Sequence, residues 1–252
     1  MQERIPDSAA FFQQTGEDYA RFRPRYPAQM YSWLAEQAPG RHLAVDIATG
    51  NGQAATELAL HFDKVIAQDA AQGQLDVAEK HPKVEYQQAE AHQTRLPNAC
   101  ADLITVAQAL HWFATEAFYA EVRRIARPGA FFAAWGYCDA RITPAIDTIF
   151  EPFHRGVVGP YWPTERAIVE AHLRTLPFPF REVEVPPFEL QQLLTREGFV
   201  RYIGTWSCTQ RYRTATGKDP IPQLDSLLTP AWPDNTPLTV RWDLFFRAGY
   251  VQ

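Results

Sequence analysis

Short apolar runs alternate with amphipathic stretches between residue 43 and about residue 137. Each apolar run is brief and ends at small or polar residues, which is the pattern of buried strands. The stretches between them have helical periodicity. The predicted strands lie at 43–47, 64–70, 84–89, 101–110 and 130–137, and the predicted helices at 53–62, 73–81 and 118–126. Because crossover helices force neighbouring strands to run parallel, this alternation predicts an α/β fold with a doubly wound, Rossmann-like sheet.

The flanking segments follow other patterns. Residues 1–27 are polar and aromatic with prolines at 24 and 27, so we expect an arm that leads into a helix at 28–37. After Tyr137 the chain is rich in prolines and aromatic residues, and residues 141–180 read as helical. Further on, the predicted elements are a strand at 181–190, helices at 195–206 and 222–232, and a long final strand at 237–250. The final strand could complete the sheet in an antiparallel sense, and the helices could cap its mouth.

Bulk properties exclude several classes of protein. The chain has 252 residues, 46% of them hydrophobic and 21% charged, which is ordinary for a globular protein. A net charge of −5 provides no general attraction to nucleic acid. The three cysteines form no CxxC pair, so we expect neither disulfides nor a metal site. Without a signal peptide or an apolar run of about 18 residues, we expect a cytoplasmic protein with no membrane partner. We also expect a monomer, which does not follow from these two features.

Polar residues follow successive predicted strands. Asp46 ends the first strand before a glycine turn, Asp69 ends the second, Glu90 follows the third and Gln108 follows the fourth. In open parallel sheets, ligands bind beyond these carboxyl ends, so the three carboxylates converge on one crevice. A single carboxylate of this kind would more often cap a helix or remain solvated.

A dinucleotide suits this crevice poorly. Its pyrophosphate would lie beside Asp46, where like charges repel, and the turn lacks the GxGxxG spacing of dinucleotide binders. S-adenosylmethionine (SAM) carries no phosphate and has an ammonium and a sulfonium, so it fits better. Asp69 is then placed to accept hydrogen bonds from the ribose hydroxyls, and Glu90 could accept from the adenine N6.

This pattern resembles the class I SAM-dependent methyltransferases, in their type 11 branch. The resemblance rests on VDIATGNG (45–52), VIAQDAA (65–71), AEAHQTRLP (89–97), ADLITVAQALHWF (101–113) and ARPGAFF (126–132). The segments YARFRPRYP (19–27) and TWSCTQRY (205–212) are similar to the narrower group of trans-aconitate methyltransferases. The resemblance implies a seven-stranded sheet whose last strand is antiparallel, with a helical cap.

The resemblance also implies roles for individual residues. The methionine portion would be lined by Asp46, Ala48, Gly50 and Gln108, the ribose and adenine by Asp69, Ala70, Glu90 and Ala91, and the cofactor would be covered by Tyr19 and Arg23 of the arm. The family usually has glycine at Ala48, where alanine is tolerated if its φ is negative. For Arg23 the alternative is a surface salt bridge.

Four regions follow from this interpretation. They are an arm and first helix over the cofactor (1–40), a SAM-binding core (41–137), a helical cap insertion (138–180), and a part that completes the sheet and cap (181–252).

The implied activity is methyl transfer from SAM to a small molecule, with a carboxylic acid oxygen as the first candidate acceptor. The alternatives are a methyltransferase acting on RNA or protein, and an inactive SAM-binding protein. His111 is the candidate catalytic base, with a structural histidine as its alternative, and Trp112 would form a wall of the substrate pocket. An acidic substrate could be clamped by lid arginines, for which the candidates are Arg23, Arg25, Arg141 and Arg211.

Overall fold

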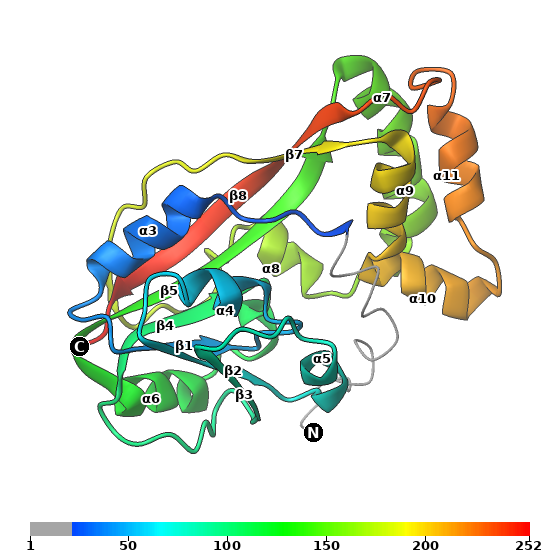
Figure 1. The fold of residues 1–252 in the computed structure, drawn as a ribbon. Helices are drawn as coiled ribbons and strands as arrows, with labels where there is room; N and C mark the ends of the chain where they lie inside the picture. Colours follow the sequence, from blue (N-terminus) through cyan, green and yellow to red (C-terminus); the bar gives the residue numbers. More distant parts are fainter. Residues whose placement is uncertain (1–21) are drawn as a thin grey trace.

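The computed structural model describes residues 22–252, so the predicted role of Tyr19 lies outside the described residues. Its centre is one sheet with the strand order β3-β2-β1-β4-β5-β8-β6, and β7 also pairs with β8 (Figure 1). The first five strands run parallel, as the alternating pattern predicts. They are β1 (Leu43–Ile47), β2 (Lys64–Asp69), β3 (Val84–Gln88), β4 (Ala101–Ala107) and β5 (Ala126–Arg141). The doubly wound α/β fold is therefore confirmed.

The helices of this half are α3 (Ala28–Gln37), α4 (Gln53–Leu58), α5 (Gln72–Asp76) and α6 (Glu116–Ile125), with a 3-10 turn η1 (Leu110–Trp112). Helix α6 has the clearest local signals: the Thr115 hydroxyl accepts a hydrogen bond from Phe118 N, and Arg123 and Arg124 occupy the last turn. Helix α4 is shorter than predicted. It ends at Leu58, and beyond it the Leu60 and His61 amides form i→i+3 hydrogen bonds.

The long strand β8 (Leu238–Tyr250) is antiparallel to β5, with pairing from Phe131 opposite Tyr250 to Arg141 opposite Arg241. The short strands β6 (Arg181–Glu182) and β7 (Leu190–Leu194) both pair with β8. The described residues therefore form eight strands rather than seven. The predicted strand at 181–190 pairs only at its two ends, because Pro186 and Pro187 lack the N–H groups that a ladder needs.

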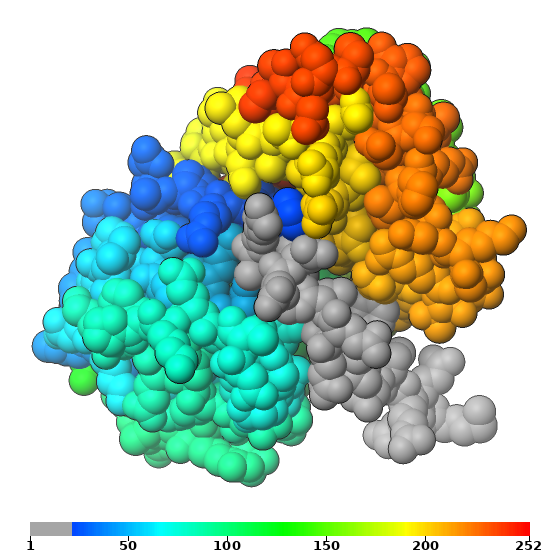
Figure 2. Space-filling view, turned by 45° about the vertical axis from the view of Figure 1, so that its right-hand side comes forward, coloured from blue at the N-terminus to red at the C-terminus, as the bar shows by residue number. Residues whose placement is uncertain are grey.

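The cap consists of α7 (Pro144–Pro152), the π-helix η2 (Phe153–Val158), the 3-10 turn η3 (Gly159–Tyr161), α8 (Arg166–Glu170), α9 (Arg196–Gly204), α10 (Ser207–Thr216) and α11 (Ile221–Leu228). In Figure 1, α7, α9, α10 and α11 gather at the end of the molecule away from α6. The space-filling view shows α9, α10 and α11 of the cap in yellow to orange, on the other side of this face from the blue and cyan first elements (Figure 2).

Helix α10 is absent from the sequence predictions because its apolar signal is weak. It buries only Cys208 and Thr209, and side chains fasten its start: the Thr209 hydroxyl donates to the Ile203 carbonyl, and the Gln210 amide donates to the Gly204 carbonyl. Its position therefore depends on hydrogen bonds to α9 that no periodicity reveals.

Two hydrophobic clusters cover the two faces of the sheet. On one face, Trp135 packs with Tyr31 of α3 and joins the interior of the cap. On the other face, Phe132 packs against Phe118 of α6. Buried strands covered on both sides account for the nearly continuous apolar runs in the sequence. Among the residues that the structure describes, no helix is both long and apolar enough to span a membrane.

Candidate active site

The turn after β1 brings the backbone of residues 48–52 to the carboxyl edge of the sheet. Gly50 has a φ of 57° and Gly52 a φ of 83°, both in the left-handed region that favours glycine. A side chain at position 52 would also collide with Tyr86, since an added Cβ would lie 2.1 Å from the Tyr86 hydroxyl. Positions 50 and 52 therefore favour glycine, and position 52 has no room for a side chain.

Ala48 does not meet the condition set for it from the sequence. Its φ is 56°, so an alanine occupies a conformation that costs an L-residue about 1–2 kcal/mol. Glycine would avoid this cost, which gives a physical reason for the residue that the resembling family usually has at this position.

Asp46 is fully buried at the end of β1. The Thr105 hydroxyl donates to its Oδ1 at 2.6 Å, and the Thr49 hydroxyl donates to its Oδ2 at 2.6 Å. Burial raises the pKa of Asp46 to about 6, the two hydroxyls oppose this rise, and the charge of Asp69 adds to it. The carboxylate therefore joins β1, β4 and the glycine turn, and its predicted contact with the methionine portion stays a prediction.

Asp69 ends β2 with a carboxylate that spans two loops. Its Oδ1 accepts from the Ala71 amide and its Oδ2 from the Gly50 amide, each at 2.8 Å. Burial chiefly raises the pKa of Asp69, the backbone donors lower it, and the charge of the exposed Glu90 raises it further. Since each carboxylate oxygen has two lone pairs, Asp69 can still accept from ligand hydroxyls. The carboxylates of Asp69 and Glu90 suit a ligand that has a cation and lacks phosphate.

The remaining predicted cofactor residues lie around the same edge. Ala70 follows β2 and Ala91 follows Glu90, both half-buried. Gln108 follows β4 with a φ of 57°, and its side-chain amide donates to the Tyr137 carbonyl at 3.3 Å. Gln108 therefore turns toward β5 rather than along its own strand.

A pocket opens beyond Gln108, between β5 and the cap. It is lined by Arg23, Gln108, His111, Trp112, Tyr137, Cys138, Asp139, Trp162, Pro163, Arg166, Val169, Tyr202, Thr205, Trp206, Ser207 and Gln210. Five of these residues carry tyrosine or tryptophan rings. Composition alone does not decide whether the many aromatic residues of the second half form the core or a pocket. In the structure they contribute to both.

His111 and Trp112 both line this pocket, and their rings lie 4.8 Å apart in a tilted arrangement. Burial, and then the positive charge of Arg166, lowers the pKa of His111 to about 4. At neutral pH the imidazole is therefore uncharged, so one ring nitrogen can donate a hydrogen bond and the other can accept one. A base with so low a pKa accepts protons weakly.

Of the four candidate arginines, Arg23 lines the pocket. Its guanidinium donates to the Tyr137 hydroxyl at 3.1 Å and to the Thr205 carbonyl at 3.2 Å, so it joins β5 to the cap. Arg25 is exposed and pairs with Glu79, Arg141 is exposed at the end of β5, and Arg211 lies half-buried on α10. Among the described residues, the lining of this pocket includes none of these three.

Arg166 is a pocket residue that sequence reasoning missed. Its side chain is only 13% exposed, and it forms ion pairs with Asp139 at 3.2 Å and Glu170 at 3.1 Å. Its guanidinium also lies over the Trp162 ring, 4.5 Å from the centroid. The i,i+4 spacing of Arg166 and Glu170 was visible in the sequence, but it reads as an exposed helix pair.

The strand order and the parallel first five strands define a doubly wound, Rossmann-like fold. Residues 45–134 match the model of the methyltransferase domain. A methyltransferase of Dictyostelium discoideum is 32% identical over 239 residues, with 92% of this chain and 91% of that protein covered. The chain therefore belongs to the class I SAM-dependent methyltransferases, and its cofactor is SAM.

Solved structures agree with this assignment. A type II methyltransferase from Anaeromyxobacter dehalogenans has a TM-score of 0.85 and 43% identity, covering 91% of this chain and 98% of that chain. A methyltransferase from Anabaena variabilis, described as part of an antibiotic biosynthesis pathway, has a TM-score of 0.54 and 16% identity, covering 86% and 98%. The second likeness concerns the fold alone.

Asp46→Asn tests the buried carboxyl. Its pKa is about 6 in the folded chain against 3.8 ordinarily, so folding favours the protonated form. In the natural chain, the ionisation of Asp46 therefore contributes most to the free energy of unfolding below about pH 4. This contribution falls as the pH rises to about 6 and is constant above that. Relative to the natural chain, the variant should gain up to about 3 kcal/mol between pH 4 and pH 7, measured by urea unfolding. The exposed Asp76→Asn is the control, and a constant difference across this range would contradict the raised pKa.

Proposed function

We propose that this methyltransferase transfers the methyl group of SAM to a carboxylate oxygen of a small acid with an apolar or aromatic body. The observation that carries the proposal is the pocket beyond Gln108, where aromatic walls and two guanidinium groups lie together. SAM supplies an electrophilic methyl carbon, so the protein mainly has to align the acceptor and exclude water. The resemblance to trans-aconitate methyltransferases supports an acidic acceptor.

The walls of the pocket favour a substrate with an apolar body. Trp162 and Trp206 lie 5.3 Å apart, and Tyr202 meets Trp206 edge-on at 5.6 Å. Rings held by one another in this way give a firm apolar surface that would exclude water from a bound acceptor. The enclosure by the cap also favours a small molecule over RNA or protein.

The two guanidinium groups that line the pocket, those of Arg23 and Arg166, favour an anion. Burial raises the pKa of Tyr202, while the charges of Arg23 and then Arg166 oppose that rise. Arg166 also lowers the pKa of His111. Asp139 and Glu170 hold the Arg166 guanidinium in one orientation, which leaves it preorganised for a planar carboxylate.

His111 takes part in this proposal as a neutral group that contacts the acceptor. A carboxylate is already deprotonated at neutral pH, so it needs no general base. The uncharged imidazole would instead donate a hydrogen bond that orients the acceptor, with Trp112 as the adjoining wall. On the cofactor side, we propose that Asp69 accepts from the ribose, Glu90 and Ala91 face the adenine, and Gly50, Ala48 and Gln108 approach the methionine portion. Asp46 would act there through the turn that it holds.

Asp69→Ala should weaken SAM binding by about 1–3 kcal/mol, because charge-assisted hydrogen bonds to the ribose are lost. Isothermal titration calorimetry with SAM measures this change. Asp69 also holds the Gly50 and Ala71 amides, so the melting temperature of the variant has to be compared with that of the natural chain. Asp63→Ala, at an exposed carboxylate paired with His42, is the matched control. Unchanged SAM affinity would refute the ribose role.

The acceptor proposal is tested with a panel of small aromatic and aliphatic acids beside their amides and alcohols, with release of S-adenosylhomocysteine as the readout. We expect turnover of the acids only. Arg166→Gln should lower kcat/KM for these acids by about 10–100-fold and leave SAM affinity intact, because the variant loses a charged hydrogen bond to the acceptor. The exposed Arg201→Gln, whose partner is Glu197, is the control. Equal turnover of neutral analogues, or of RNA or protein in place of acids, would reject the proposal.

His111→Ala should reduce kcat with little change in SAM affinity, because the group orients the acceptor and does not touch the cofactor. The pH profile distinguishes orientation from base catalysis. A histidine with a pKa near 4 stays neutral between pH 6 and pH 8, so kcat of the natural chain should show no ionisation of His111 in that range. Normal turnover of the variant would remove the role.

A further inference from the structure

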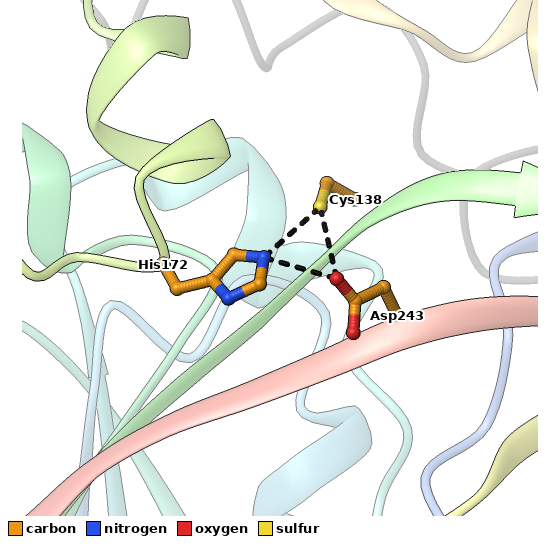
Figure 3. A group of neighbouring side chains, drawn as sticks. All are labelled: Cys138, His172 and Asp243. Carbon is orange, nitrogen blue, oxygen red and sulfur yellow. Dashed lines mark hydrogen bonds and ion pairs between the residues drawn. The ribbon is translucent and has the colours of Figure 1, made fainter.

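Three side chains from distant parts of the chain meet beside the acceptor pocket, and one of them, Cys138, also lines that pocket (Figure 3). They are Cys138 of β5, His172 of the turn after α8, and Asp243 of β8. The Cys138 Sγ lies 3.8 Å from the His172 Nε2 and 4.0 Å from the Asp243 Oδ2, and the Nε2 lies 3.0 Å from the Oδ2. The proposed methyl transfer uses none of these contacts.

We propose that Cys138, His172 and Asp243 form a binding site for one thiophilic divalent cation, for which Zn²⁺ is the natural candidate. Sulfur, imidazole nitrogen and carboxylate oxygen are the three ligand types that zinc takes in proteins. Mg²⁺ and Ca²⁺ prefer oxygen ligands alone, so the sulfur and nitrogen disfavour them. The site adjoins the acceptor pocket through Cys138, but its argument does not use the identity of the acceptor. It departs from the expectation of no metal site, which considered cysteine pairs close in sequence.

The distances fit a metal better than a catalytic triad. In a nucleophilic triad, the acid and the nucleophile contact different nitrogens of the histidine ring. Here both Sγ and Oδ2 approach the same nitrogen, and Figure 3 shows the other nitrogen turned away from both. The three atoms lie 3.8, 4.0 and 3.0 Å from one another, which brings all three within reach of one ion.

The strand pair fixes two of the ligands. Cys138 and Asp243 are direct partners in the antiparallel ladder of β5 and β8, so their side chains leave the same face of the sheet. The pairing therefore holds the sulfur and the carboxylate near each other before any ion arrives.

The position of His172 is set by a contact of its ring and by the conformation of its backbone. Its ring stacks on Phe245, with centroids 4.7 Å apart and planes inclined by 8°. Its backbone has a φ of 52° and the next residue, Leu173, a φ of 60°. Buried Arg247 donates to the Leu173 carbonyl at 2.9 Å, which pins this uncommon turn in place. The imidazole is thus presented to the other two ligands with little freedom to turn.

Solvent and charge also favour a cation at this point. The side chains of His172 and Asp243 are 40% and 57% exposed and line a surface groove that also holds Glu182, so an ion and a fourth, water ligand have access. On binding, the Sγ–H bond breaks, the Sγ–metal bond forms and the proton leaves to the buffer.

The test uses the full chain, freed of metal with a chelator and titrated with Zn²⁺ against a chromogenic chelator, and separately with Co²⁺ as a spectroscopic probe. We expect one equivalent of Zn²⁺ to bind, a thiolate-to-cobalt charge-transfer band to appear, and the melting temperature to rise on zinc addition. None of these readouts depends on methyl transfer, so failure of the metal site and failure of the acceptor proposal are distinguishable.

Cys138→Ser and Asp243→Asn should each weaken zinc binding by about tenfold or more, and Cys138→Ser should abolish the charge-transfer band. Cys100→Ser, at a half-buried cysteine elsewhere, is the matched control and should retain both. Melting curves in chelator show whether each variant is folded; should one fail to fold, the other decides. Absence of stoichiometric binding by the natural chain, or an undiminished affinity in both variants, would overturn the proposal.

Discussion

The pairing of β5 with β8 is the constraint on which the other parts of this molecule depend. Both strands are much longer than the parallel strands beside them, and together they run from the edge of the SAM-binding half into the cap. One end of the pair closes the parallel sheet beside β4, and β7 extends the other end toward α9. The SAM-binding half and the strands that contact cap helices α8 and α9 thus belong to one hydrogen-bonded sheet, and the acceptor pocket lies between this sheet and the cap.

The carboxylates at the strand ends stabilise loops of the protein itself, in addition to lying where a ligand would bind. Asp46 satisfies two hydroxyls and Asp69 two backbone amides, so each fixes a loop that a cofactor would approach. Burial raises the pKa of both groups, so their ionised forms are less stable in the folded protein than in water. A cationic ligand would offset part of this destabilisation, and this connects the stability of the edge with its specificity.

The sequence predicts the first half of the fold well because its signals are local. Each parallel strand is a short apolar run bounded by turn residues, and helix α3 and strand β1 have the predicted bounds. The resemblance adds the antiparallel last strand. Helix α10 and the break between β6 and β7 were missed, because hydrogen bonds to α9 decide the first and two prolines decide the second.

The candidate site was predictable only where it follows the strand ends. Gln108, His111 and Trp112 come directly after β4, and all three line the acceptor pocket. Arg166 lies on a short helix far along the chain, and its position beside Asp139 depends on how the cap returns to β5. For the same reason, no sequence spacing connects Cys138, His172 and Asp243, which only the β5–β8 ladder and the turn after α8 bring together.

The register of the β5–β8 ladder shifts between Cys138 and Ala140, so Asp139 forms a bulge that changes the outer part of β5. Up to Tyr137, the odd-numbered residues from Phe131 face the same side as the cap interior, yet beyond the bulge it is Ala140 and Ile142 that join this cluster. One inserted residue therefore reverses the parity of the strand, so that Arg141 meets solvent instead of the apolar interior. The residues that face the apolar interior are therefore odd-numbered before Asp139 and even-numbered after it.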